Sequence, residues 1–136
     1  MKMKFELTLA DAKRVAAAAE AEARRNDWNV VIAIVDDAGL PVYLERLDGT
    51  QPASCEIAQH KARAAALFRR PTKALEEIVA GGRMALLSLP QITPVEGGVP
   101  LVHEGQVIGA IGVSGVQSAQ DGQVAQAGAA ALGASV

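Results

Sequence analysis

The chain has 136 residues, of which 50% are hydrophobic and 3% aromatic, and its formal net charge is -2. This length is typical of a single domain, which we predict over residues 1–136, and the interspersed charges exclude the basic surface of a nucleic-acid-binding protein. A lone cysteine, Cys55, excludes an internal disulfide. No segment reaches the ~18 apolar residues of a membrane span or has a signal-peptide pattern, so we predict a cytoplasmic protein without nucleic-acid or membrane partners.

The first half of the chain predicts a helix, a hairpin and a second helix. A threonine and an aspartate three residues apart open the first helix, and alanines recur at helical spacing over residues 8–26. Residues 30–35 are continuously apolar and β-branched, which is typical of a strand covered on both faces. Residues 40–45 alternate as its hairpin partner, and a serine begins a helix over residues 54–69.

The second half predicts a helix, a strand, a hairpin and a last helix. A proline suited to a first turn begins a short helix over residues 71–80, and two glycines end it. Residues 84–89 are apolar and predict a strand, and residues 101–113 predict a hairpin around a glycine-containing turn. Ser118 and Asp121 have capping-box spacing at the start of the last helix. The order predicts an α+β sandwich, an antiparallel sheet with helices packed on both faces.

A lysine interrupts the apolar stripe of the helix predicted over residues 54–69. The apolar members of that stripe are Ile57, Ala58, Ala62, Ala65 and Phe68. Lys61 falls between them, so its side chain must either extend to the edge of the core or meet an anionic group. In the second case Lys61 faces a carboxylate or a propionate in a pocket shared with Arg46.

Glycines mark two further places. Gly109 and Gly112 lie inside a predicted strand, where glycine is less favourable than alanine by ~0.5–1 kcal/mol, and this predicts close approach by a helix or a ligand. The surrounding GAIGVSG does not fit the G-x-G-x-x-G pattern of dinucleotide binding. The Glu96-Gly97-Gly98 turn instead predicts a small anion-binding concavity of backbone N–H groups, at which ligand contact and its absence are both open.

The candidate ligand-binding residues combine these charges and amides. They are Arg46, Asp48, Lys61, Glu96, Gly97 and Gly98. Arg46 and Asp48 follow a predicted strand, where side chains converge on sites, although a surface ion pair explains them equally well. Lys61, Arg46 and Asp48 are also the candidate catalytic residues, because a partly desolvated lysine serves as an acid or base near neutral pH. No metal-ligand spacing occurs.

Four segments together resemble the GlcG/HbpS family, also called heme-degrading or DUF336 proteins. They are VVIAIVDDAGLPVYLERLDG, SCEIAQHKARAAALF, EGGVPLVHEGQVIGAIGVSG and QDGQVAQAGAAAL. The resemblance implies a profilin- or PAS-like fold with a five-stranded antiparallel sheet, and assembly into tetramers or octamers. It implies no single activity: members include extracellular heme-binding redox sensors, a heme-binding domain of a corrinoid adenosyltransferase, and proteins associated with glycolate, diol or aromatic catabolism.

Two functions follow. The first is a small-molecule-binding accessory protein of the GlcG/HbpS type with heme as a candidate ligand, for which His60 and His103 are weak axial-ligand candidates because a surface histidine is the default. The alternative is a cofactor-free enzyme acting on a small organic acid from hydroxyacid or aromatic-compound catabolism, in which Lys61 and Arg46 bind the carboxylate. A purely structural assembly subunit is a third interpretation. Small-residue helices with flat apolar faces further predict a homo-oligomer.

Overall fold

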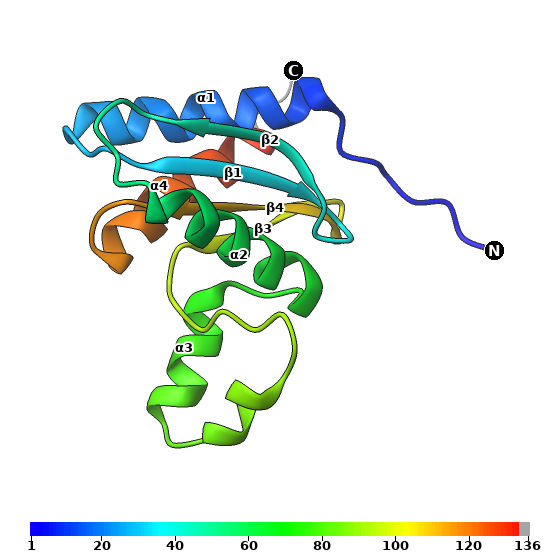
Figure 1. The fold of residues 1–136 in the computed structure, drawn as a ribbon. Helices are drawn as coiled ribbons and strands as arrows, with labels where there is room; N and C mark the ends of the chain where they lie inside the picture. Colours follow the sequence, from blue (N-terminus) through cyan, green and yellow to red (C-terminus); the bar gives the residue numbers. More distant parts are fainter. Residues whose placement is uncertain (134–136) are drawn as a thin grey trace.

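The computed structural model describes residues 1–133, which form an α+β fold around one four-stranded antiparallel sheet (Figure 1). The elements are α1 (Leu9–Arg25), β1 (Val31–Asp36), β2 (Pro41–Arg46), α2 (Ala53–Phe68), α3 (Thr72–Ala80), the 3-10 helix η1 (Met84–Ser88), β3 (Gly98–His103), β4 (Gln106–Ser114) and α4 (Ser118–Leu132). The strand order is β2-β1-β4-β3. None of the helices in residues 1–133 is long and apolar enough to cross a membrane. The α+β class and the helices on both faces are confirmed.

The predicted fifth strand is wrong. Residues 84–89 form η1 and its C-terminal cap instead of a strand, and they pair with no strand of the described sheet. Leu86 alone is buried in this run, where it packs against Ala64 and Leu75. A short apolar run does not distinguish a strand from a helical turn, and here one inward-facing leucine anchors the segment while its neighbours stay exposed.

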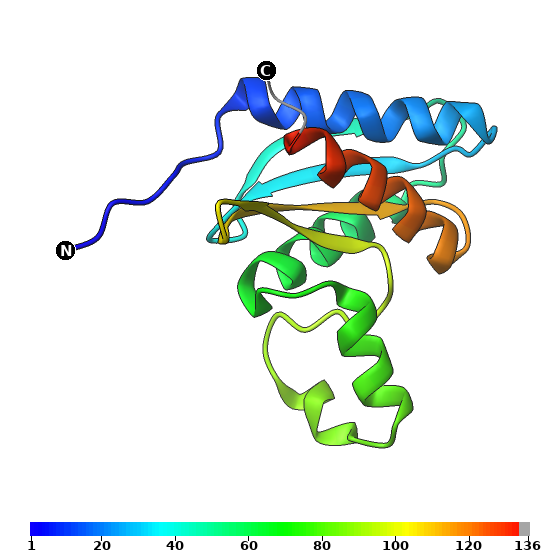
Figure 2. The same cartoon turned by 180° about the vertical axis from the view of Figure 1, so that it is seen from behind.

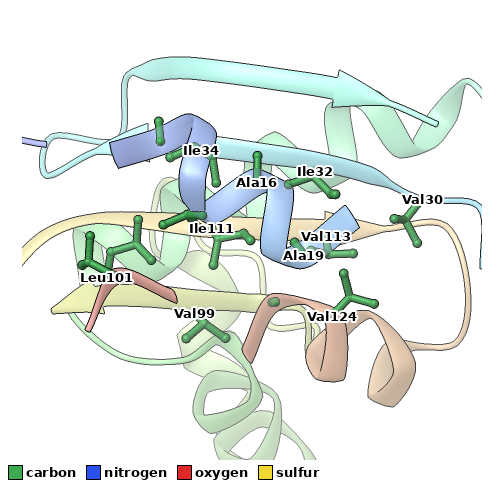
Figure 3. Packing of buried hydrophobic residues seen from close by; sticks show 14 of the residues in the cluster. Ala16, Ala19, Val30, Ile32, Ile34, Val99, Leu101, Ile111, Val113 and Val124 are labelled. Atoms are coloured by element: carbon green, nitrogen blue, oxygen red, sulfur yellow. The ribbon is translucent and has the colours of Figure 1, made fainter. Parts of the chain in front are cut away.

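The helices α1 and α4 cover one face of the sheet and form the larger hydrophobic core with it (Figures 2 and 3). Ile32 and Ile34 of β1 point toward this layer, where they meet Ala16 of α1 and other small residues. Val124 of α4 completes the same core from beside α1. Alanines at the contact let α1 and α4 lie close together and close to the strands, which explains why a core with few aromatic residues is filled.

α2 covers the opposite face and approaches the sheet so closely that a side chain on β4 would not fit. A Cβ atom placed on Gly112 would lie 2.0 Å from the carbonyl oxygen of Ala58 and 2.5 Å from the amide nitrogen of Ala62. The predicted close approach at Gly112 is therefore confirmed, and its cause is a helix. Ile57, in contrast, is 38% exposed, so its predicted place in the buried stripe of α2 is wrong: it lies at the edge of the helix.

Candidate functional site

A buried ion pair connects α2 to the start of α4. The Lys61 ammonium donates to Asp121 Oδ2 and to the carbonyl oxygen of Val113, and each donor–acceptor distance is 3.0 Å. The two charged side chains are only 2% and 3% exposed. Extension of Lys61 to the edge of the core is therefore excluded. The anionic partner that its position predicted is a carboxylate of the protein itself.

Asp121 plays a different part from the predicted one. The cap of α4 is formed by Gln117 and Gln120, not by Ser118 and Asp121. Asp121 turns inward, where its Oδ1 accepts a hydrogen bond from the Val116 amide over 3.1 Å. Burial raises the pKa of Asp121, and the nearby ammonium and amide groups oppose this rise. The capping-box spacing of Ser118 and Asp121 gave Asp121 a local explanation, so the sequence alone did not predict its contact with Lys61.

The Glu96-Gly97-Gly98 turn lines a cavity of about 260 Å³ between α3 and α4. The other walls come from α3, from Val99 and from α4, among them Ala74, Glu77, Gly122 and Gln126. Lys61 lies directly behind this wall, since a Cβ on Gly97 would be 2.7 Å from its Nζ. The structure thus brings Lys61 and residues 96–98 together.

Two of the three backbone amides of this turn, those of Glu96 and Gly98, are engaged by α3. The Glu96 amide donates to Glu76 Oε1 at a distance of 2.9 Å, and the Gly98 amide donates to Thr72 Oγ1 at 2.8 Å. The amides of Glu96 and Gly98 thus bind a carboxylate and a hydroxyl of the chain, and ligand contact at this turn stays a prediction. These two hydrogen bonds fix the turn against the start of α3, and with it the position of the Glu96 side chain.

Arg46 and Asp48 lie elsewhere in the fold. Arg46 is the last residue of β2, an edge strand that is separated from β3 by β1 and β4. Its guanidinium donates two hydrogen bonds to the carbonyl oxygen of Thr50, at distances of 2.6 and 3.0 Å. Asp48 lines a separate cleft of about 170 Å³ beside the end of α1. The enzyme alternative assigned Arg46 and Lys61 to one substrate carboxylate. In the structure each of them binds a different group of the protein. The enzyme alternative itself stays a prediction.

The two histidines differ in their surroundings. His60 is exposed on α2, whereas His103 ends β3 and is half-buried. The His103 ring meets Phe5 edge to face, with ring centroids 4.6 Å apart and an interplanar angle of 88°. Both residues line a cleft of about 190 Å³ that also contains Arg14 and Ile108. Within residues 1–133, no group of three or more histidine, cysteine or acidic side chains is arranged to hold a metal ion.

A pair of carboxyl groups, missed by sequence reasoning, connects α1 to the edge strand β2. Burial raises the pKa of Glu45 to about 7, and the adjacent Glu20 carboxyl adds to the rise. Glu20 also accepts from Arg24 over 2.6 Å, and its own pKa is lowered by hydrogen bonds from Glu45 and Arg24. The two residues lie in different elements, Glu20 in α1 and Glu45 in β2, so no local spacing signals the contact.

Replacement of Glu45 by glutamine is expected to remove a pH dependence of stability. The carboxyl titrates near 7 in the folded chain but near 4.5 when unfolded, so folding takes up a proton between these values and wild-type stability falls as pH rises through them. Because the side chain is partly solvated, we expect a difference of ~1 kcal/mol or less. Urea unfolding at pH 5 and pH 8 measures it.

The exposed turn residue Glu104 supplies the matched control, Glu104→Gln. Glu45→Gln should flatten the pH dependence while Glu104→Gln retains the wild-type slope. Equal slopes in all three proteins would contradict the assignment of the titration to Glu45.

These features define a small α+β domain with shallow clefts on both sides of a sheet whose glycine, Gly112, allows close helix packing. The chain belongs to the HbpS-like family: the family model described as "Haem degrading protein HbpS-like" matches residues 7–130. The family resemblance of the sequence is thereby confirmed.

Relatives and solved structures agree with this assignment. Protein GlcG of Escherichia coli K12 is 50% identical over 114 residues, which cover 84% of this chain and 85% of GlcG. The crystal structure of the DUF336 protein ORFY of Klebsiella pneumoniae has a TM-score of 0.91 and 32% identity, covering 99% of this chain and 97% of that one. The crystal structure of a PduOC:heme complex has a TM-score of 0.83 and 30% identity, covering 93% of this chain and 95% of that one.

Proposed function

We propose that this chain is a heme-binding accessory protein of the GlcG/HbpS type, in which His103 is the axial ligand. Two findings support the ligand: the family is described as haem-degrading, and a structural neighbour that the chain covers almost completely was solved with heme. The observation that carries the proposal in this chain is the half-buried His103 in a cleft beside Phe5.

The residues of this cleft fit the chemistry of a porphyrin. His103 supplies an imidazole nitrogen, a common ligand of heme iron. Phe5 and Ile108 offer apolar contact, and Arg14 offers a guanidinium for a propionate. Glu6 and Asp11 also line the cleft, and Asp11 lies 3.6 Å from Arg14, so the propionates must extend away from these two carboxylates. When bound, heme supplies the redox and ligand-binding chemistry of its iron.

The cleft is too small to enclose heme, so the proposal requires a second copy of the chain. At about 190 Å³ it is smaller than the ~300–1,000 Å³ of enclosed ligand sites, so it covers only part of a porphyrin. We therefore include in the proposal the homo-oligomer implied by the family resemblance, a tetramer or octamer, in which a second copy covers the remainder. Exposed apolar residues elsewhere on the surface, Leu44 of β2 and Met84 and Leu87 of η1, support assembly in general and not at this cleft.

Titration with hemin tests the ligand and the residue together. The wild-type protein should give a sharp Soret band at one heme per chain. His103→Ala should weaken binding by at least about tenfold, since even outer-shell changes at metal sites cost ~10–100-fold. His60→Ala, on the exposed side of α2, should change it less than about twofold.

The outcomes separate two failures. A weak, broad Soret band from the wild-type protein would reject heme as the ligand. A sharp band that His103→Ala leaves unchanged would reject His103 as its axial ligand.

A further inference from the structure

The cavity between α3 and α4 contains a carboxylate that no neighbouring group engages. Glu96 is half-buried and lines the cavity. The hydrogen bonds of residues 1–133 reach its backbone amide but not its side chain, and none of the five ion pairs in this part of the chain includes it. Its oxygens remain open to solvent, so a ligand that brings its own donor replaces only water there.

A helix glycine lets this carboxylate lie where it does. Gly122 is buried in the second turn of α4, where glycine is unfavourable. A Cβ placed on Gly122 would lie 2.7 Å from Glu96 Oε2 and 3.0 Å from its Cγ. The missing side chain therefore leaves room for the Glu96 carboxylate against α4. Its backbone is held on the other side by the bond from its amide to Glu76.

The charges around the cavity indicate the sign of the ligand. Glu77 and Lys73 are both exposed at the rim of the cavity, whereas Glu96 is half-buried in its wall. The Lys61 ammonium behind Gly97 does not add to the positive charge, because Asp121 compensates it at 3.0 Å. The two exposed charges of Glu77 and Lys73 offset each other at the rim, so the half-buried Glu96 carboxylate sets the sign inside and favours a cationic ligand over a carboxylate.

The remaining walls indicate the body of the ligand. Ala74, Val99 and Pro71 present apolar surface beside the carboxylate, and the cavity of about 260 Å³ has room within it for a small ligand. We propose that this cavity binds a small primary alkylammonium ion, whose N–H groups donate to Glu96 and whose alkyl chain contacts the apolar walls. This site is separate from the cleft of His103 and goes beyond heme binding.

Three ligands of equal chain length test the proposal: n-butylammonium, 1-butanol and butyrate, each titrated into the 15N-labelled protein at pH 7. The amide resonances of Gly97, Gly98 and Gly122 report on the cavity. Butylammonium should give saturable shifts there and bind at least about tenfold more tightly than butanol or butyrate, as one charge-assisted hydrogen bond allows. Tighter binding of butyrate or butanol, or no saturable shift with butylammonium, would overturn the proposal.

Substitutions locate the effect. Glu96→Gln keeps the shape of the side chain but removes its charge, and it should weaken butylammonium binding at least about tenfold. Glu104→Gln, in the turn between β3 and β4, is the control and should bind like the wild type. His103→Ala should also bind butylammonium normally, so failure at the heme site and failure here are distinguishable. Unchanged binding by a folded Glu96→Gln variant would refute the assignment.

Discussion

Replacement of Lys61 by methionine is expected to lower the free energy of unfolding by about 3–5 kcal/mol, because it leaves a buried carboxylate without its cation. Asp121 is 3% exposed at its side chain, and Lys61 is its only cationic partner within 4.0 Å among the described residues. The carbonyl oxygen of Val113 loses a donor as well. Urea unfolding followed by circular dichroism gives the difference directly.

The loss should depend on pH in a definite direction. Burial raises the pKa of Asp121, and Lys61 opposes this rise, so removing the lysine raises the pKa further. A carboxyl whose folded pKa exceeds its unfolded value near 3.8 reduces stability as pH rises above that value, and has no such effect below it. The deficit of Lys61→Met should therefore be smaller at pH 5 than at pH 8.

A double variant distinguishes the loss of the ion pair from a simple packing defect. In Lys61→Met/Asp121→Asn, no charge remains buried at this position, and the asparagine oxygen still accepts from the Val116 amide. The double variant should be more stable than either single one. A double variant whose losses merely add would refute the coupling.

Local signals predicted those parts of the fold in which neighbouring residues determine the structure. Thr8 and Asp11 form the predicted capping box, with their reciprocal bonds both present. The turn between β3 and β4 places Glu104 and Gly105 at positive φ values of 48° and 76°, which suits the predicted glycine. These features require only contacts within a few residues, so the sequence pattern was sufficient.

Long-range pairing decided the remainder. The position of Lys61 showed that it needed a partner, but Asp121 lies 60 residues away and had a sufficient local explanation as a cap. Glu45 and Glu20 meet only because α1 packs over β2. Residues 84–89 lacked a strand partner, a property of the whole sheet and not of the segment. The grouping of Arg46 with Lys61 similarly required the strand order, which places β1 and β4 between β2 and β3.

Replacement of Gly112 by alanine is expected to destabilise the fold by about 3 kcal/mol or more, at the upper end of overpacking effects. The added Cβ would lie 2.0 and 2.5 Å from backbone atoms of α2, which do not rotate away as a side chain does. The whole helix must therefore withdraw from β4, and its contacts with β1 and β3 would loosen at the same time. Thermal and urea unfolding measure the loss.

Gly133→Ala is the matched control for this clash. Gly133 has an ordinary negative φ of -77°, and a Cβ there would approach nothing closer than the carbonyl oxygen of Ala130, at 3.8 Å. This variant should differ from the wild type by less than ~0.5 kcal/mol. A Gly112→Ala protein as stable as Gly133→Ala would show that α2 moves away from the sheet at little cost. Because α2 also carries Lys61, that result would weaken the case for a rigid wall behind Gly97.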